Sequence, residues 1–470
     1  MCALKIEFKG AIDSSLFDPS LHELPDPFVA LVLKHLPAHD LVNLTKLNKK
    51  WYAFIRDYDS LSCRFIPYQC VYAAKYLASK LQGINLDSRK KVIELEARLN
   101  SDRAIATSLS FNLAEGSAFG RLCMPGDDYR IEVVKVLALQ NLEAAKRLTS
   151  EIEDSSSQDL AFFKIAEIEV KENAVSAAAT ADRIGDLELL SQACAAMAEN
   201  APELFLNRLI QIHQHPFINP FLRVNFQVII TKLSPPHNFT DAKEAAEQLE
   251  FKKNEALSNI AKEEAEYDFD ASQATLLSID DPNERATAQL EVVRKIVVHD
   301  VPLATVAASK IVRPFFRACA YIEIAKKDPH FQLNDILDLM SWVHQSSSSK
   351  VRLLLELAQV DPKNRMKYLE EAKAIAFSPV QSVYSADQVN VIEMEALLDV
   401  EGAHKTASLL TGITKVRALI KISQVQRQRF HFLRIASDAA LSMDDQQGDR
   451  INTDKIDALC EVGSAALDLL

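Results

Sequence analysis

Glycine is scarce in this chain, with 10 residues among 470, and tryptophan occurs only twice. Turns of sheet-rich folds use glycine, whereas glycine weakens helix interiors, so its scarcity favours helices over sheets. Hydrophobic residues make up 48% of the chain and charged residues 25%, which is the composition of a soluble protein with a sizeable buried core. The length suits either two or three globular domains or one elongated array.

Long hydrophobic runs and positive charge are also lacking. The chain has no run of 18 apolar residues, so we expect no membrane-spanning helix, and its start lacks the charged and apolar regions of a common signal peptide. The formal net charge is −12. Nucleic acids and anionic membranes are bound mainly through Lys and Arg, so an acidic chain favours neither as a partner.

Motifs that carry chemistry are missing as well. Seven cysteines are scattered without a CxxC pair, which indicates a reducing, cytoplasmic compartment and buried thiols. His213 and His215 are two residues apart, so they do not face the same way on a helix, and no third ligand lies nearby. No nucleophile elbow, HExxH or glycine-rich fingerprint occurs. We therefore expect no metal, no cofactor and no enzymatic activity of the chain itself.

The stretch Leu24–Trp51 predicts two or three short helices. Pro25 and Pro27 suit the first turn of a helix, and Pro37 ends that helix. Apolar residues then recur at helical spacing on both sides of this proline. They are Phe28, Val32, Leu36, Leu41, Leu44, Leu47 and Trp51.

This stretch is too short to be stable alone and has no disulfide or metal to hold it. The helix over residues 28–36 is apolar on more than half of its circumference, which indicates an interface. Its partner is either another protein or the rest of this chain.

These residues resemble the F-box family. The pattern of that family opens with Leu-Pro, continues with spaced aliphatic residues and an acidic-Leu pair, and ends with a basic residue and Trp. In this sequence its elements are Leu24-Pro25, Val32, Leu36, Asp40-Leu41, Leu44, Leu47 and Lys50-Trp51.

The resemblance implies a three-helix module that docks onto the Skp adaptor, and through it onto a cullin, in a ubiquitin ligase. By this resemblance Leu24, Pro25, Val32, Leu36 and Leu41 would contact the adaptor. The core of the module would consist of Leu44, Leu47 and Trp51. The remainder of the chain would then bind a protein substrate.

The rest of the chain repeats itself. The segments NEALSNIAKEE, TAQLEVVRKIV, CAYIEIAKKDP and VRLLLELAQVD align on Ala261, Val293, Ala325 and Ala358, at steps of 32, 32 and 33 residues. The same spacing continues in both directions along the chain, through Val134, Ala166, Ala198, Ile229 or Ile230, Val391 and Ser423. Alanine-rich segments alternate with these helices. Such a pattern predicts an α-solenoid, in which stacked helix pairs bury each other's faces.

The predicted fold is therefore all-α: a three-helix F-box followed by a solenoid of about ten two-helix repeats of roughly 32 residues. The predicted boundaries are an N-terminal segment at 1–20, the F-box at 21–60, a helical connector at 61–127 and the solenoid at 128–470. The repeats are tetratricopeptide-like in architecture only, because the Trp-Leu-Gly-Tyr pattern of that family is absent.

Two hypotheses for function stay open. The first is a substrate receptor of a Skp–cullin–F-box ligase, located in the cytoplasm. The combination of an F-box with such repeats also resembles proteins of chlamydia-related intracellular bacteria, which implies an effector acting in the host cytoplasm. The alternative is an interaction scaffold in which the N-terminal helices only cap the solenoid.

Overall fold

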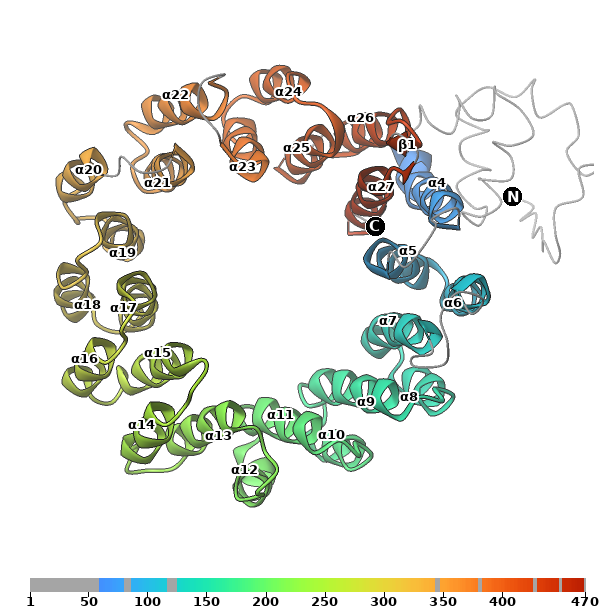
Figure 1. The fold of residues 1–470 in the computed structure, drawn as a ribbon. Coiled ribbons are helices and arrows are strands. Elements are labelled where there is room, and N and C mark those ends of the chain that lie inside the picture. The colour runs from blue at the N-terminus through green and yellow to red at the C-terminus, as the bar shows by residue number, and fades with distance from the viewer. Residues whose placement is uncertain are drawn as a thin grey trace, which may run out of the picture. The chain divides into compact units, whose positions relative to one another are not determined.

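The structure is a computed structural model that describes residues 59–79, 86–115, 125–342, 347–378, 383–425, 429–447 and 450–468. These residues form the helices α4 to α27 (Figure 1). One short antiparallel hairpin, of β1 (Gln446–Gln447) and β2 (Arg450–Ile451), pairs Gln446 with Ile451. The predicted all-α class with a repeat array is confirmed, and this hairpin between two helices is the one addition within the described ranges.

The chain divides into two compact units. Unit 1 comprises Met1–Asn100 and Ala396–Leu470, and unit 2 comprises Ser101–Glu395. The helices of unit 1 are α4 (Asp59–Ser79), α5 (Leu86–Leu99), α24 (Val400–Ser408), α25 (Gly412–Val425), α26 (Arg429–Leu441) and α27 (Thr453–Leu467).

Unit 2 holds the larger number of helices. They are α6 (Ser101–Glu115), α7 (Pro125–Gln140), α8 (Leu142–Ser150), α9 (Ser155–Glu169), α10 (Ala174–Ala181), α11 (Leu187–Ala198), α12 (Pro202–His213), α13 (Pro220–Leu233), α14 (Thr240–Glu247), α15 (Lys253–Glu264), α16 (Phe269–Leu277), α17 (Pro282–Ile296), α18 (Val301–Ser309), α19 (Pro314–Lys327), α20 (Asn334–Ser341), α21 (Ser347–Val360), α22 (Arg365–Ala376) and nearly all of α23 (Ser385–Ala396). In chain order, α7 to α26 form ten consecutive pairs, in agreement with the predicted number of repeats.

Two layers of helices build unit 2. From α7 to α21 each odd-numbered helix packs on the next odd-numbered helix, and the even-numbered helices cover them from one side (Figure 1). Buried alanines allow this close approach, and examples are Ala166, Ala177 and Ala304, all with no exposed surface. The stacking is that of an α-solenoid.

Helix caps repeat with the same period. The side chains of Asn141 and Asn173 cap α8 and α10, and those of Asp268 and Asp300 cap α16 and α18, each pair being 32 residues apart. These caps share one backbone geometry, with φ between −143° and −156° and ψ between 92° and 97°. A cap side chain accepts hydrogen bonds from the free N–H groups of the first turn, so each one fixes where an even-numbered helix starts.

A buried glutamate at the end of α9 connects three successive helices. Glu169 accepts hydrogen bonds from Lys146 Nζ of α8 and from Thr180 Oγ1 of α10, both at 2.6 Å, and a third from Ser176. Burial raises the pKa of Glu169, but these hydrogen bonds and the lysine charge outweigh it and hold the pKa below its usual value.

The pattern Glu-x3-Asn/Asp-x6-Thr marks this junction and occurs four times in the sequence, starting at Glu96, Glu169, Glu264 and Glu395. Each of the four glutamates pairs with a lysine 21 to 23 residues earlier: Lys75–Glu96 at 3.0 Å, and Lys146–Glu169, Lys243–Glu264 and Lys373–Glu395 at 2.6 Å. The first occurrence lies in the segment predicted as a connector. Helices α4 and α5 thus carry the same lysine–glutamate pair as the repeats.

The predicted register is off at two repeats. Of the residues used for alignment, Ala325 and the pair Ile229 and Ile230 are only half-buried. Their helices bury Ile324 and Val228 instead. Both mismatches are a shift of one or two residues within a helix whose neighbouring positions are also apolar, so the sequence pattern alone does not decide between them.

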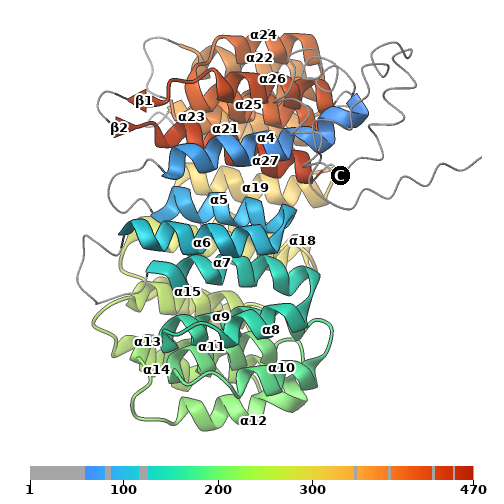
Figure 2. The same cartoon turned by 90° about the vertical axis from the view of Figure 1, so that its right-hand side faces the viewer.

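Unit 1 joins the two ends of the described chain. The most extensive helix–helix contact in the described residues is between α4 and α27, and Figure 2 shows the two lying side by side. Helix α5 also packs on α27, with Lys91 paired to Asp457 at 2.8 Å. Gly463 makes the close approach possible, because a Cβ there would lie 2.6 Å from Leu95 Cδ2 and 3.3 Å from Cys70 Cβ.

Candidate functional site

The residues predicted to bind the adaptor lie outside the described residues, which begin at Asp59. This holds for Leu24, Pro25, Val32, Leu36 and Leu41, and equally for the predicted core residues Leu44, Leu47 and Trp51. Their roles therefore stay predictions.

Helix α4 is the first described element after that motif. It buries Ile66, Cys70, Ala74 and Leu77, which recur at steps of three and four residues and form one apolar stripe. Besides α27, it contacts α5 and α26. The segment that directly follows the motif is therefore fixed on the C-terminal helices of unit 1.

Four buried or half-buried cysteines, Cys70, Cys194, Cys319 and Cys460, are poor nucleophiles. Burial raises the pKa of Cys70 to about 12 and the pKa values of Cys194 and Cys319 to about 11, and the pKa of Cys460 is raised as well. A thiol reacts as the thiolate, so these four groups are almost fully protonated at neutral pH. They act as small apolar side chains in the helix interfaces.

The histidines of the HQH segment are placed separately. His213 lies at the end of α12, where burial lowers its pKa. His215 lies in the following turn, with its ring 5.5 Å from that of Phe217. Within the described ranges no group of three His, Cys, Asp or Glu side chains is arranged to hold a metal ion.

A ladder of ion pairs crosses the odd-numbered helices of unit 2. Lys232 of α13 lies 2.9 Å from Glu199 and 3.4 Å from Glu263, and Lys295 of α17 also binds Glu263. Burial raises the pKa of Glu263, but the two lysines outweigh burial and lower it. The ladder continues through Arg294–Glu323 at 3.4 Å and Lys326–Glu356 at 2.6 Å. These charges compensate one another and hold neighbouring repeats together.

Large apolar side chains are exposed in turns from even- to odd-numbered helices of unit 2. Phe217 is 83% exposed, and Phe251 and Val312 are each 81% exposed. They lie in the turns before α13, α15 and α19, which occupy the same end of the helix pairs because the chain alternates direction from helix to helix. Exposed apolar side chains that recur along one edge are typical of protein-binding surfaces.

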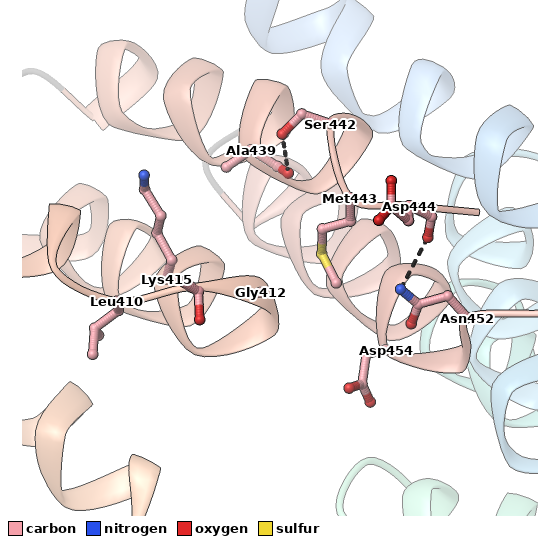
Figure 3. A pocket seen from close by; sticks show the side chains of 10 residues that line it. Leu410, Gly412, Lys415, Ala439, Ser442, Met443, Asp444, Asn452 and Asp454 are labelled. Carbon is pink, nitrogen blue, oxygen red and sulfur yellow. Dashed lines mark hydrogen bonds between the residues drawn. The ribbon is translucent and has the colours of Figure 1, made fainter. Parts of the chain in front are cut away.

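Unit 1 contains a pocket of about 550 Å³ (Figure 3). It lies between the start of α25, the end of α26 and the start of α27, and its lining is Leu410, Thr411, Gly412, Lys415, Ala439, Ser442, Met443, Asp444, Asn452 and Asp454. Next to it, the buried Lys455 donates to Leu441 O at 2.8 Å and to Asp445 Oδ1 at 2.7 Å, which fixes the end of α26 to the start of α27. Sequence periodicity does not reveal this pocket, because it forms where three segments meet.

Residues 21–62 match the F-box domain family. The F-box resemblance is thereby confirmed, and the matched range ends inside α4. An F-box suggests a Skp-binding adaptor in ubiquitin ligase complexes, here with a helical-repeat body, and F-box proteins are typically non-catalytic substrate receptors.

A search of curated proteins found no match to the chain. None of the described helices is long and apolar enough to cross a membrane.

Proposed function

We propose that this chain is a non-catalytic substrate receptor of a Skp–cullin–F-box ubiquitin ligase. Its F-box docks the Skp adaptor through Leu24, Pro25, Val32, Leu36 and Leu41, and its helical repeats bind a target protein. The observation that carries the proposal is the F-box match at residues 21–62, which runs directly into a helix packed on the repeats.

The physical task of such a receptor is positioning. A target must be held near the carrier of activated ubiquitin, because proximity replaces a slow bimolecular encounter. Helix α4 serves this task, since it is buried against α27 instead of being a free linker. The exposed Phe217, Phe251 and Val312 in unit 2 supply apolar surface for protein binding.

The proposed location is the cytoplasm. The resemblance to proteins of chlamydia-related bacteria supports a more specific proposal, in which the chain is an effector that acts on host proteins in the host cytoplasm. Assembly with a host Skp adaptor and a bacterial origin of the gene would together support it.

Titration of a purified Skp adaptor into the full chain tests the receptor role. We expect tight binding, and a loss of at least about a hundredfold in the Leu24→Ala, Pro25→Ala double variant, because residues that fill the centre of an interface carry most of its energy. The matched control is Leu16→Ala with Pro19→Ala, which removes the same residue types before the matched range and should bind normally.

The alternative function is a scaffold in which the N-terminal helices only cap the repeats. The packing of α4 on the last helix, α27, is the observation that favours it. Failure of the wild-type chain to bind any Skp adaptor, with helical content intact, would decide for the scaffold.

A further inference from the structure

The polar groups that line the pocket of unit 1 fall into two sets. One set is used by the fold: Asn452 Oδ1 accepts from Lys455 N at 3.2 Å, Asn452 Nδ2 donates to Asp444 O at 2.9 Å, and Ser442 Oγ donates to Ala439 O at 2.8 Å. These hydrogen bonds fix the pocket wall.

The other set consists of charged side chains. The side chains of Lys415, Asp444 and Asp454 have no hydrogen bond or ion pair with other described residues. The nearby Arg417 donates hydrogen bonds of 3.2, 2.9 and 2.7 Å to Glu461, and its charge also attracts Asp454. In Figure 3, Lys415 stands on the α25 side and the two aspartates stand on the opposite side. The pocket therefore offers one positive and two negative groups on facing walls.

Position 412 strengthens the positive wall. In α9, α11 and α17 an aspartate cap stands two residues after a buried isoleucine, as Asp281 does after Ile279. In α25 the residue two positions after Leu410 is Gly412, which has φ +56° and open space around the position of a Cβ, and the helix begins there, so Thr411 precedes its first turn. The start of α25 thus lacks an acidic cap and has no acidic residue in its first turn. Its positive helix end and Lys415 both favour an anion there.

Apolar side chains also line the pocket. Met443 lies in the middle of the view in Figure 3 and Leu410 lies at its edge. An aliphatic stem is suited to this floor, as in lysine and arginine side chains, whose methylene groups pack on apolar surface while the charge stays in water.

We infer that this pocket binds the carboxyl terminus of a target protein that ends in arginine or lysine. The terminal carboxylate binds Lys415 and the start of α25, and the basic side chain binds Asp444 and Asp454 across Met443. A basic C-terminal residue carries both charges on one residue, which a pocket of about 550 Å³ accommodates. An internal basic residue lacks the carboxylate.

The inference deepens the proposed function and rests on it in one respect, namely that the bound chain end belongs to a ubiquitination target. The pocket lies in unit 1, the same compact unit as α4, so a target bound there is held on the body that directly follows the F-box. Peptide binding itself is independent of the adaptor.

Fluorescence anisotropy with the full chain and labelled tetrapeptides tests the inference. We expect Gly-Ala-Ala-Arg with a free carboxylate to bind at least about tenfold tighter than its carboxamide, than Gly-Ala-Ala-Glu, and than Ala-Arg-Ala-Ala. Lys415→Ala should abolish the difference between carboxylate and carboxamide. Asp444→Asn with Asp454→Asn should abolish the preference for a terminal arginine.

The matched control is Glu401→Gln with Asp438→Asn, two exposed acidic residues of unit 1 outside the pocket lining. It removes the same net charge and should leave peptide affinity unchanged, whereas an equal loss would reduce the effect to general charge attraction and overturn the inference.

Equal binding of the carboxamide or of the internal arginine, or no binding of any peptide, would overturn it as well. Skp titration of the same preparations separates the two claims: adaptor binding without peptide binding rejects the pocket alone, and the reverse rejects the receptor role alone.

Discussion

The junctions of unit 2 and the α4–α27 contact of unit 1 show two ways of burying a helix face. In unit 2 each helix packs on its neighbours, and partners such as Lys146 and Glu169 are 23 residues apart. In unit 1 the face of α27 is covered by α4, a helix from the other end of the described chain. Helix α4 also contacts α26, where Cys70 and Ser437 meet although they are 367 residues apart in sequence. A repeat pattern specifies contacts between neighbouring helices. The packing of α4 on the terminal helix α27 depends instead on particular residues such as Gly463.

Deletion of residues 453–470 breaks the long-range contact and should have the largest effect. It exposes the stripe of Ile66, Cys70, Ala74 and Leu77, and burial of each large apolar side chain contributes about 1.5–3 kcal/mol. We expect amide exchange in α4 to rise at least about a hundredfold, with unit 2 unchanged, because stability in repeat arrays is local. Unaltered protection of residues 66–79 would contradict the assigned contact.

Gly463→Val changes the same contact at one position. A side chain there meets the side chains of Leu95 and Cys70, so we expect a loss of about 1–3 kcal/mol in the free energy of unfolding of unit 1, measured by chemical denaturation. Gly185→Val, in unit 2, is the comparison: a Cβ there lies 3.4 Å from Asp159 Oδ2, an ordinary contact, so we expect a smaller loss in the free energy of unfolding of unit 2. Equal losses in both variants would argue against a special role for Gly463.

Glu169→Gln weakens a neighbour junction in unit 2 and should have a smaller effect, about 1 kcal/mol at neutral pH, because glutamine keeps an acceptor oxygen for Lys146 and Thr180 but loses the charge. Glu167→Gln is the control, as that side chain is one-third exposed and pairs only with Lys164 in the same helix.

The effect should depend on pH in one direction. The folded-state pKa of Glu169 lies below the ordinary value of 4.5, so the ionised junction stabilises the fold above that value and is lost as pH falls through the lowered pKa. The difference between wild type and Glu169→Gln should therefore be full near pH 7 and shrink in acid. A difference that stays constant down to acid pH would show that the charge of Glu169 is not what stabilises the junction.

Much of the fold follows from the sequence. The helical spacing of apolar residues and the 32-residue repeat period predict the helix pairs of unit 2, because stacked helix pairs repeat their contacts along the chain. The Leu24–Trp51 pattern predicts the F-box. The pattern that starts at Glu96, Glu169, Glu264 and Glu395 is also a repeated spacing in the sequence. It does not predict buried ion pairs, because a glutamate on a helix is usually solvated and the lysine partners are identified only in the structure.

Other features need the structure. The α4–α27 contact joins segments without a shared pattern, and Gly463 has no sequence signal that distinguishes it from other glycines. The pocket around Lys415 forms where three segments meet, and only the departure at Gly412 from the aspartate found in α9, α11 and α17 hints at it. Such sites follow from three-dimensional neighbours that periodicity does not encode.

The receptor role is tested most directly by size-exclusion chromatography of the full chain with a Skp adaptor and a cullin. The account predicts that the chain co-migrates with the cullin only when the adaptor is present, and that the Leu24→Ala, Pro25→Ala variant stays behind. Co-migration of that variant, or absence of the wild-type chain from the cullin peak, would contradict it.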